Sequence, residues 1–123
     1  MSSNNKTSIV SLEIKDNDNA AKDKKRLVAV FSLADGKTKT VRFGMYKSAG
    51  TYADGAAESK RDAYIARHSK SGENWTRSGA MTAGFLSRWV LWHARKNNEI
   101  KNKLSNIIGI NNIKVNFKRT PVK

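Results

Sequence analysis

The side chains that could do chemistry gather in the middle of the chain, where both histidines, all three tryptophans and several arginines occur. A metal site needs several ligands that converge on one point, yet His68 and His93 are 25 positions apart and only Glu73 could join His68. Glu58 and Asp62 are four residues apart and could pair as acid and base on one helix face, although a solvated helix surface explains them better. These residue types predict no metal centre, no cofactor and no enzymatic activity.

Anion binding is the chemistry that the sequence favours. Arginine and lysine beside aromatic residues suit phosphate groups or an acidic protein surface, although a solvated basic face has the same composition. Two pairs, Lys60 with Arg67 and Arg88 with Arg95, have a seven-residue spacing that returns to nearly the same side of a helix. The candidate anion- or partner-binding residues are Lys60, Arg61, Arg67, Lys70, Trp75, Arg77, Arg88, Arg95 and Lys96.

Positive charge dominates the composition. The 123 residues include 24 Lys and Arg against 10 Asp and Glu, which gives a net charge of +14. Residues 1–55 contribute ten basic and six acidic side chains (+4), and residues 56–123 contribute fourteen and four (+10). Such a field attracts nucleic acid, anionic lipid or acidic proteins, and it also keeps a protein dispersed without any specific partner.

The length and the residues that are missing narrow the classes of protein. A chain of 123 residues has the size of one domain. The absence of cysteine excludes disulfides, thiolate zinc sites and a cysteine nucleophile. No apolar run approaches the roughly 20 residues that span a bilayer, and the first residues lack the apolar core of a signal peptide. We therefore expect no membrane span and a protein that stays in the cell or is packaged there.

Alternating apolar residues predict a strand meander over residues 8–43. Its expected strands are 8–14, 26–33 and 38–43, and Asp35-Gly36 supplies a hairpin turn between the last two. A closing strand is predicted at 112–117, with the basic segment 118–123 and residues 1–7 as tails.

Helical periodicity dominates residues 56–108. We expect helices at 56–68, 82–94 and 98–107, with Asp54 capping the first, Thr82 capping the second and Gly109 stopping the third. In the second helix the apolar face is formed by Phe85, Leu86, Trp89, Val90, Trp92 and His93, with Gly84, Arg88, Leu91 and Arg95 opposite. A strand over residues 85–92 is the alternative, because aromatic residues also favour sheets. The predicted fold is a single α+β domain over 1–123, a small antiparallel sheet of three to four strands packed against two to three helices.

The tryptophans admit two interpretations. Stacking on unpaired bases is one, but the position of Trp89 and Trp92 beside Phe85 and Leu86 favours the core. Trp75 lies in a polar loop and could be either a lid over the core or an exposed anchor.

Several sequence blocks resemble a known family. They are Thr40-Val41-Arg42-Phe43-Gly44, Tyr64-Ile65-Ala66-Arg67-His68, Glu73-Asn74-Trp75, and Thr82-Ala83-Gly84-Phe85-Leu86-Ser87-Arg88-Trp89 followed by Leu91-Trp92. Their order and spacing over roughly residues 37–108 resemble a family of small basic proteins encoded by giant double-stranded DNA viruses of algae and amoebae. That family has no assigned activity, so no catalytic residue is carried over. Where related sequences continue with Asn-Lys-Pro and a longer helix, this chain has His93-Ala94-Arg95-Lys96-Asn97, so the family pattern does not define the join to the third helix.

The resemblance implies a viral setting, and the charge suggests how the protein works. The leading expectation is a non-enzymatic structural protein of the virion, a minor capsid or cement component that bridges larger shell proteins and is made in the cytoplasm of the infected host cell. The alternative is a nucleic-acid-binding protein that coats or condenses the viral genome, contacting DNA or RNA through the basic C-terminal half. A regulatory adaptor for an acidic host protein is a third, weaker hypothesis.

Overall fold

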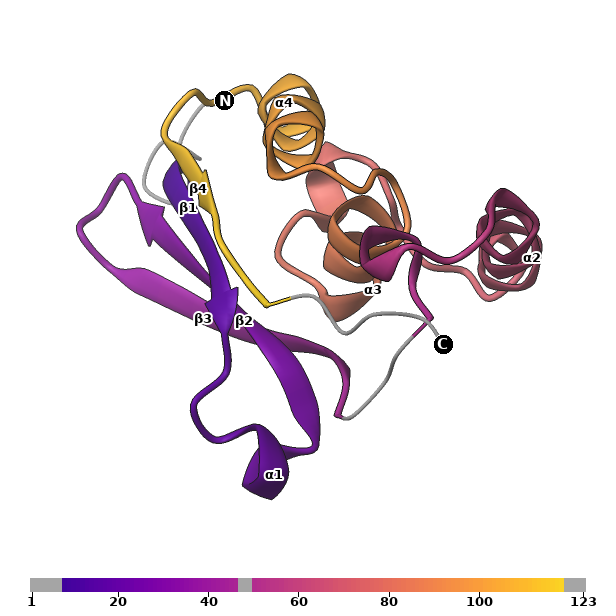
Figure 1. Ribbon diagram of the computed structural model, residues 1–123. Helices are drawn as coiled ribbons and strands as arrows, with labels where there is room; N and C mark the ends of the chain where they lie inside the picture. Colours follow the sequence, from indigo (N-terminus) through magenta and orange to yellow (C-terminus); the bar gives the residue numbers. More distant parts are fainter. Residues whose placement is uncertain (1–7, 47–49, 119–123) are drawn as a thin grey trace.

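The computed structural model describes residues 8–46 and 50–118, which form a sheet covered on one face by helices (Figure 1). Strands β1 (Ile9–Asp16), β2 (Lys25–Leu33) and β3 (Thr38–Met45) make the predicted antiparallel meander. Gly36 in the turn between β2 and β3 has a φ of +87°, which glycine adopts without strain. The strand and turn predictions are confirmed, with each strand end within two residues of its expected position.

The fourth strand differs from the prediction. β4 (Ile113–Val115) pairs with β1 in parallel, and the strand order is β3-β2-β1-β4. Two neighbouring parallel strands cannot be joined by a tight turn and need a long crossover connection. Here the chain between β1 and β4 contains β2, β3 and all the helices. The expected all-antiparallel sheet is therefore wrong at this edge, whereas the α+β class is confirmed.

The helical layer contains short and long pieces. They are the 3₁₀ turn η2 (Tyr52–Asp54), α2 (Glu58–Ser69), the 3₁₀ turn η3 (Arg77–Gly79), α3 (Ala83–Leu86), the π-helical segment η4 (Ser87–Leu91) and α4 (Asn97–Ile108). The short helix α1 (Ala20–Asp23) lies outside this layer, in the connection from β1 to β2 at one end of the sheet (Figure 1). α3 and α4 lie against the sheet, and α2 stands farther from it (Figure 1). α4 ends at Gly109, whose φ is +83°, as the sequence predicted.

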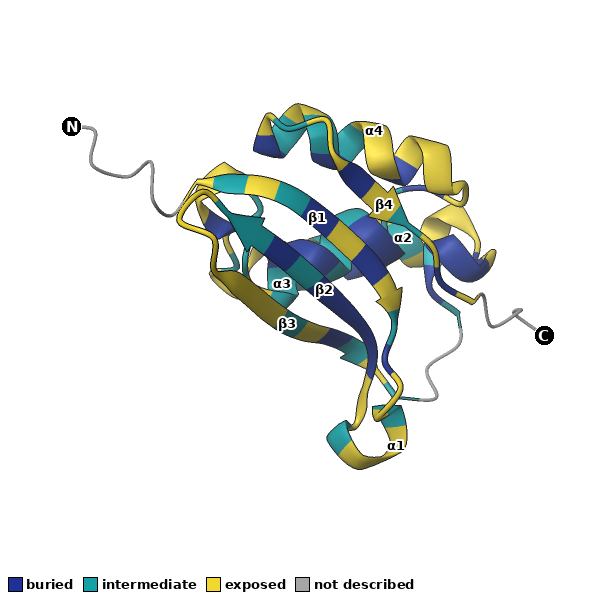
Figure 2. Ribbon diagram, turned by 90° about the vertical axis from the view of Figure 1, so that its left-hand side faces the viewer, coloured by how far each residue is buried: buried dark blue, intermediate teal, exposed yellow. Residues whose placement is uncertain are grey.

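One apolar core joins the sheet to the helices. Along β1, alternate residues turn inward and are buried, whereas in β2 the four consecutive residues 26–29 are buried (Figure 2). The largest completely buried side chains come from both layers: Leu12, Ile14, Leu27, Phe31, Phe43, Phe85, Leu86, Val90, Leu91, Ile100, Leu104 and Ile108. Ile113 and Phe117 from the closing segment complete this cluster.

The predicted helix at 82–94 is interrupted. Thr82 does cap it, because its Oγ1 accepts the N–H of Phe85 at 3.3 Å, but α3 passes into η4 and the helix ends at Leu91. A π-helical turn contains one extra residue, so buried Phe85 and Leu86 are followed five positions later by buried Val90 and Leu91. Leu91 is thus in the core, not on the opposite stripe. The strand alternative for residues 85–92 is also wrong.

Asp54 does not cap a helix. α2 begins at Glu58 after Ala57, and the Asp54 carboxylate instead accepts two hydrogen bonds of 2.7 Å from the buried guanidinium of Arg26. Thr51 Oγ1 donates to the same carboxylate at 2.7 Å, and Arg26 Nη2 also donates to the carbonyl of Lys118 at 2.9 Å. This pair therefore ties the start of β2, η2 and the closing segment together.

Of the predicted tails, residues 1–7 and 119–123 lie outside the described residues.

Candidate functional site

An aromatic stack attaches α2 to the rest of the protein. The ring of Tyr64 stacks on His68 at 4.1 Å and on Trp92 at 4.6 Å between ring centroids, the second pair being almost parallel at 8°. Tyr64 is the only buried residue of α2. Burial, followed by the charge of Glu73, raises the pKa of Tyr64 to about 12, so its hydroxyl stays protonated at neutral pH. Tyr64 is therefore a packing residue that fixes the helix.

Glu73 connects the loop after α2 to this stack. Its carboxylate accepts hydrogen bonds from His68 Nδ1 at 2.8 Å and from Trp75 Nε1 at 2.9 Å. Burial alone would raise the pKa of Glu73, but the hydrogen bonds from His68 and Trp75 outweigh it, and the net pKa is lowered. The backbone carbonyl of Trp75 in turn accepts the indole N–H of Trp89 at 2.9 Å. Two tryptophans are thus used in contacts within the protein.

Arg88 is also directed inward. Its Nη1 donates to the carbonyl of Trp92 at 3.0 Å, and its guanidinium lies 4.1 Å from the ring centroid of Trp89 and 5.5 Å from that of Trp75. Burial, followed by the charge of Arg61, lowers its pKa. Because the helix ends at Leu91, the expected helical pairing of Arg88 with Arg95 is wrong.

The other predicted pair lies on one side of α2. Lys60 and Arg67 line the same surface hollow of about 400 Å³, together with Trp92. Lys70 follows at the end of the helix and is also exposed. We call Lys60, Arg67 and Lys70 the α2 stripe. Glu58 and Asp62 lie on nearly the opposite side of the helix from Lys60 and Arg67 by the 3.6-residue period.

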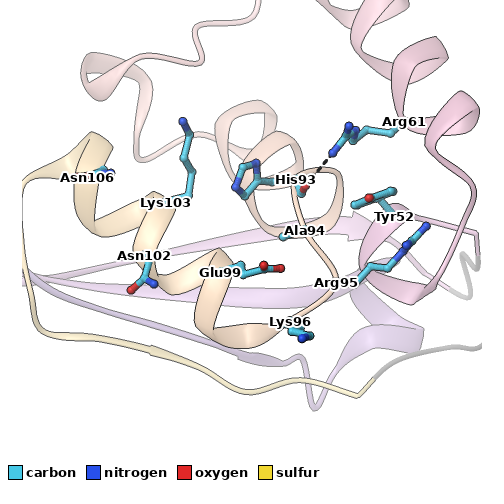
Figure 3. Close-up of a pocket in the computed structure, with 10 residues that line it drawn as sticks. All are labelled: Tyr52, Arg61, His93, Ala94, Arg95, Lys96, Glu99, Asn102, Lys103 and Asn106. Atoms are coloured by element: carbon cyan, nitrogen blue, oxygen red, sulfur yellow. Dashed lines mark hydrogen bonds between the residues drawn. The ribbon is translucent and has the colours of Figure 1, made fainter.

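Three further predicted residues meet in a second hollow, the basic pocket (Figure 3). Its cations are Arg61 from α2, Arg95 and Lys96 from the segment before α4, and Lys103 from α4 itself, around a volume of about 620 Å³. Tyr52 lies between two of them, with the guanidinium groups of Arg61 and Arg95 at 4.5 and 4.3 Å from its ring centroid (Figure 3).

Hydrogen bonds to backbone carbonyls hold the two arginines of the basic pocket. Arg61 Nη1 donates to His93 at 3.2 Å, and Arg95 Nη2 donates to Ala56 at 2.7 Å. Burial lowers the pKa of His93, as do the positive charges of Arg88, Lys103 and Arg61, against an opposing effect of Glu99. His93 is therefore mostly neutral at pH 7.

The sequence did not identify the whole pocket. Lys103 and Tyr52 were not among the predicted site residues, because they are far from the aromatic segment in sequence. The sequence did contain one indication: Lys103 follows Glu99 by four residues, so the two side chains are neighbours on the same face of α4. Arg77 lies elsewhere, in a third hollow with Ser8 and Met81, near the C-terminal end of α4.

Two kinds of site can be assessed directly in the described residues. No group of three His, Cys, Asp or Glu side chains gathers there as a metal site would require. Within residues 8–46 and 50–118, no helix combines the length and the apolar character needed to cross a membrane.

Comparisons with known proteins give one informative match. The chain is 38% identical over 77 residues to an uncharacterized protein of Acanthamoeba polyphaga mimivirus, a match that spans 58% of this chain and 73% of the mimivirus protein. No family model matches the chain. No solved structure matches it either.

Proposed function

The chain belongs to the same family as that mimivirus protein, and from this premise we propose that it is a non-enzymatic structural protein of a giant-virus particle. Its role is that of a minor capsid or cement component that bridges larger shell proteins. The α2 stripe is the contact surface, and the partner is an acidic segment of a shell protein.

The observation that carries this proposal is the exposure of α2. Of its twelve residues only Tyr64 is buried, and the helix stands away from the sheet (Figure 1). The aromatic stack and the Glu73 hydrogen bonds fix this outlying helix in place, so its charged edge is presented in a defined orientation. A preorganised surface loses less conformational freedom on binding than a flexible one.

The charges of α2 indicate which partner fits. Lys60 and Arg67 lie along one edge, whereas Glu58 and Asp62 lie nearly opposite them by the 3.6-residue period. A partner with spaced carboxylates would be attracted to the first edge and repelled by the second, which fixes its orientation. The tryptophans support a protein partner over unpaired bases, since the ring of Trp92 already stacks on Tyr64 and that of Trp89 on the guanidinium of Arg88.

Virion fractionation tests this function. After stepwise removal of layers from purified particles, the protein should remain with the shell, and recovery only with the genome core would reject the proposal. Reversal of the stripe by Lys60→Glu with Arg67→Glu should abolish incorporation. The control, Lys22→Glu with Lys39→Glu, makes the same charge change at exposed positions of α1 and β3 and should leave incorporation intact.

A second candidate function is coating or condensing the viral genome. The observation in its favour is that basic hollows flank α2 on two sides, the α2 stripe on one and the basic pocket on the other. Phosphate contacts of this kind weaken steeply as salt rises. A gel-shift titration with DNA and RNA decides the matter, because failure to bind either at low salt eliminates this function.

A further inference from the structure

Strand β3 has one edge without a partner strand among the described residues. The sheet order is β3-β2-β1-β4, so β3 lies at the end of the sheet and pairs with β2 alone. Figure 2 shows β3 as the outermost strand of the meander, with mostly exposed residues. The other end of the sheet is different, because β4 has only three residues and packs against α4. β3 is therefore the long open edge of the described sheet.

The hydrogen-bond pattern identifies the backbone groups that this edge offers. In the hairpin between β2 and β3, the N–H of Leu33 donates to the carbonyl of Lys37 at 2.8 Å. Because inward and outward groups alternate along an antiparallel strand, the N–H and C=O groups of Thr38, Thr40 and Arg42 face away from β2. Within residues 8–46 and 50–118, no hydrogen bond uses these outward groups. They form a row of donors and acceptors that can pair with one more strand.

β3 lacks most of the features that shield a sheet edge. Natural edges are commonly protected by a bulge, a proline or a very short strand. β3 has eight residues, contains no proline and keeps one register with β2 along its length. Lysine is another such protection, and β3 carries Lys39. This edge is therefore selective, because Lys39 repels a basic strand and attracts an acidic one.

Two side chains of β3 define the sequence that fits. Lys39 and Met45 are six residues apart, so they face the same side of the strand at a separation of about 20 Å. Lys39 is exposed and has no carboxylate partner among the described residues, whereas Arg42 pairs with Asp23 at 3.0 Å. Met45 is 74% exposed. Side chains directly opposite each other on paired strands lie about 4.5–5.5 Å apart, so a carboxylate beside Lys39 and an apolar residue beside Met45 complement this edge.

A second copy of the chain does not complement it. The copy would bring another net charge of +14, and its own β3 would bring Lys39 and Arg42 but no carboxylate. Two such surfaces repel each other. Charge therefore favours an acidic segment of a different protein.

We propose that the open edge of β3 binds an extended acidic segment of another protein as an added strand of the sheet. Main-chain hydrogen bonds to Thr38, Thr40 and Arg42 provide the affinity, while Lys39 and Met45 select the sequence and direction of the segment. This surface goes beyond the shell-bridging function, which uses the α2 stripe. β3 and α2 lie on opposite sides of the molecule (Figure 1), so each proposal can fail without the other.

A designed peptide tests the edge directly. The probe is Leu-Thr-Val-Thr-Val-Thr-Glu-Thr with both ends capped, which in antiparallel register places leucine beside Met45 and glutamate beside Lys39. Added to the full chain, it should shift the NMR amide signals of Thr38, Thr40 and Arg42 and leave those of α2 unchanged. Absence of binding, or shifts only outside β3, would overturn the proposal.

Two N-methylated versions of the peptide separate strand pairing from side-chain contact. Methylation of the threonine opposite Thr40 removes the N–H that donates to Thr40, whereas methylation of the valine opposite Val41 removes an N–H that faces away from β3. The first should raise the dissociation constant roughly tenfold, and the second should change it little. Equal effects would contradict an added strand.

Variants of the protein test the same edge from the other side. Thr40→Pro removes an N–H that faces solvent, a position where an edge strand tolerates proline, and Thr40→Val keeps that N–H. The peptide should bind to Thr40→Val and not to Thr40→Pro, and equal binding to both would reject the site. If Thr40→Pro does not fold, the two N-methylated peptides decide the question on the unaltered chain.

Exchange of charge and the oligomeric state complete the test. Lys39→Glu should weaken the peptide roughly three- to tenfold, and lysine in place of the peptide's glutamate should restore the affinity for this variant; no restoration would refute the selection of an acidic partner. Lys60→Glu with Arg67→Glu should leave peptide binding unchanged, since a loss would place the peptide on α2 instead. In sedimentation, a dimer of the unaltered chain that Thr40→Pro dissociates would assign the edge to a second copy, against the proposal.

Discussion

The buried pair of Arg26 and Asp54 gives a sharp test of what holds the fold together. Asp54→Asn keeps the shape of the side chain but replaces one carboxylate oxygen by an NH₂ group, which is a donor facing the donors of Arg26. The side chains of Arg26 and Asp54 are only 9% and 0% exposed, so water cannot solvate the arginine that loses its partner. Removing one member of a buried pair costs about 3–5 kcal/mol. The remaining amide oxygen can still accept from Arg26 Nη1 and from Thr51, so we expect the lower part of that range.

Urea unfolding at equilibrium measures this loss, and thermal unfolding should show a fall in Tm of roughly 10–20 °C. Asp23→Asn is the matched control. Asp23 pairs with Arg42 at 3.0 Å, but these side chains are 26% and 49% exposed, and such pairs contribute about 0–1 kcal/mol. If Asp54→Asn costs no more than Asp23→Asn, our account of the buried pair is wrong. Replacement of both partners, by Arg26→Met with Asp54→Leu, should be less destabilising than Asp54→Asn alone, because no unpaired charge remains.

Three other substitutions test the local packing around α2 and η3. Gly79→Ala should lower the free energy of unfolding by about 1–3 kcal/mol, because a Cβ there would overlap the carbonyl oxygen of Asn74; a neutral effect in urea unfolding would contradict this close approach. Tyr64→Ala removes both ring stacks and should speed hydrogen exchange in α2 while the strands keep their protection; unchanged exchange in α2 would refute the anchoring role. The lowered pKa of Glu73 means that the folded state binds fewer protons, so its stabilising contribution is present above the ordinary pKa of 4.5 and is lost as the pH falls through the lowered value. The stability difference between the unaltered chain and Glu73→Gln should therefore shrink on acidification below about pH 4.5, and a difference that stayed constant with pH would exclude an ionic contribution of Glu73.

Local patterns in the sequence predicted most of the elements. Strand β2, the Gly36 turn and the end of α4 at Gly109 follow from side-chain periodicity and from backbone angles that few residues other than glycine adopt. These features depend on residues that are neighbours along the chain, and for that reason they could be predicted without knowledge of the tertiary structure.

The features that were missed depend on distant partners. Asp54 has the residue type of a helix cap, but Arg26 lies 28 positions away, and no local pattern reveals that pairing. The parallel direction of β4 depends on the path of the whole helical half. The π-helical turn shifts the buried positions by one residue, so Leu91 enters the core and Trp89 is only half-buried, a change that an assumed period of 3.6 residues cannot predict.

The same distinction explains where the basic surface lies. The mixture of tryptophan and arginine in the sequence suggested a contact platform, but Arg88 and the indole N–H groups of Trp75 and Trp89 have partners inside the protein. These partners are mostly carbonyls and rings, which satisfy the geometry of a cation and leave its charge uncompensated. The positive potential of Arg88 therefore still reaches the surface, although its side chain is half-buried. It emerges beside the aromatic segment, at the α2 stripe and the basic pocket, so the segment acts as the support that orients these two surfaces.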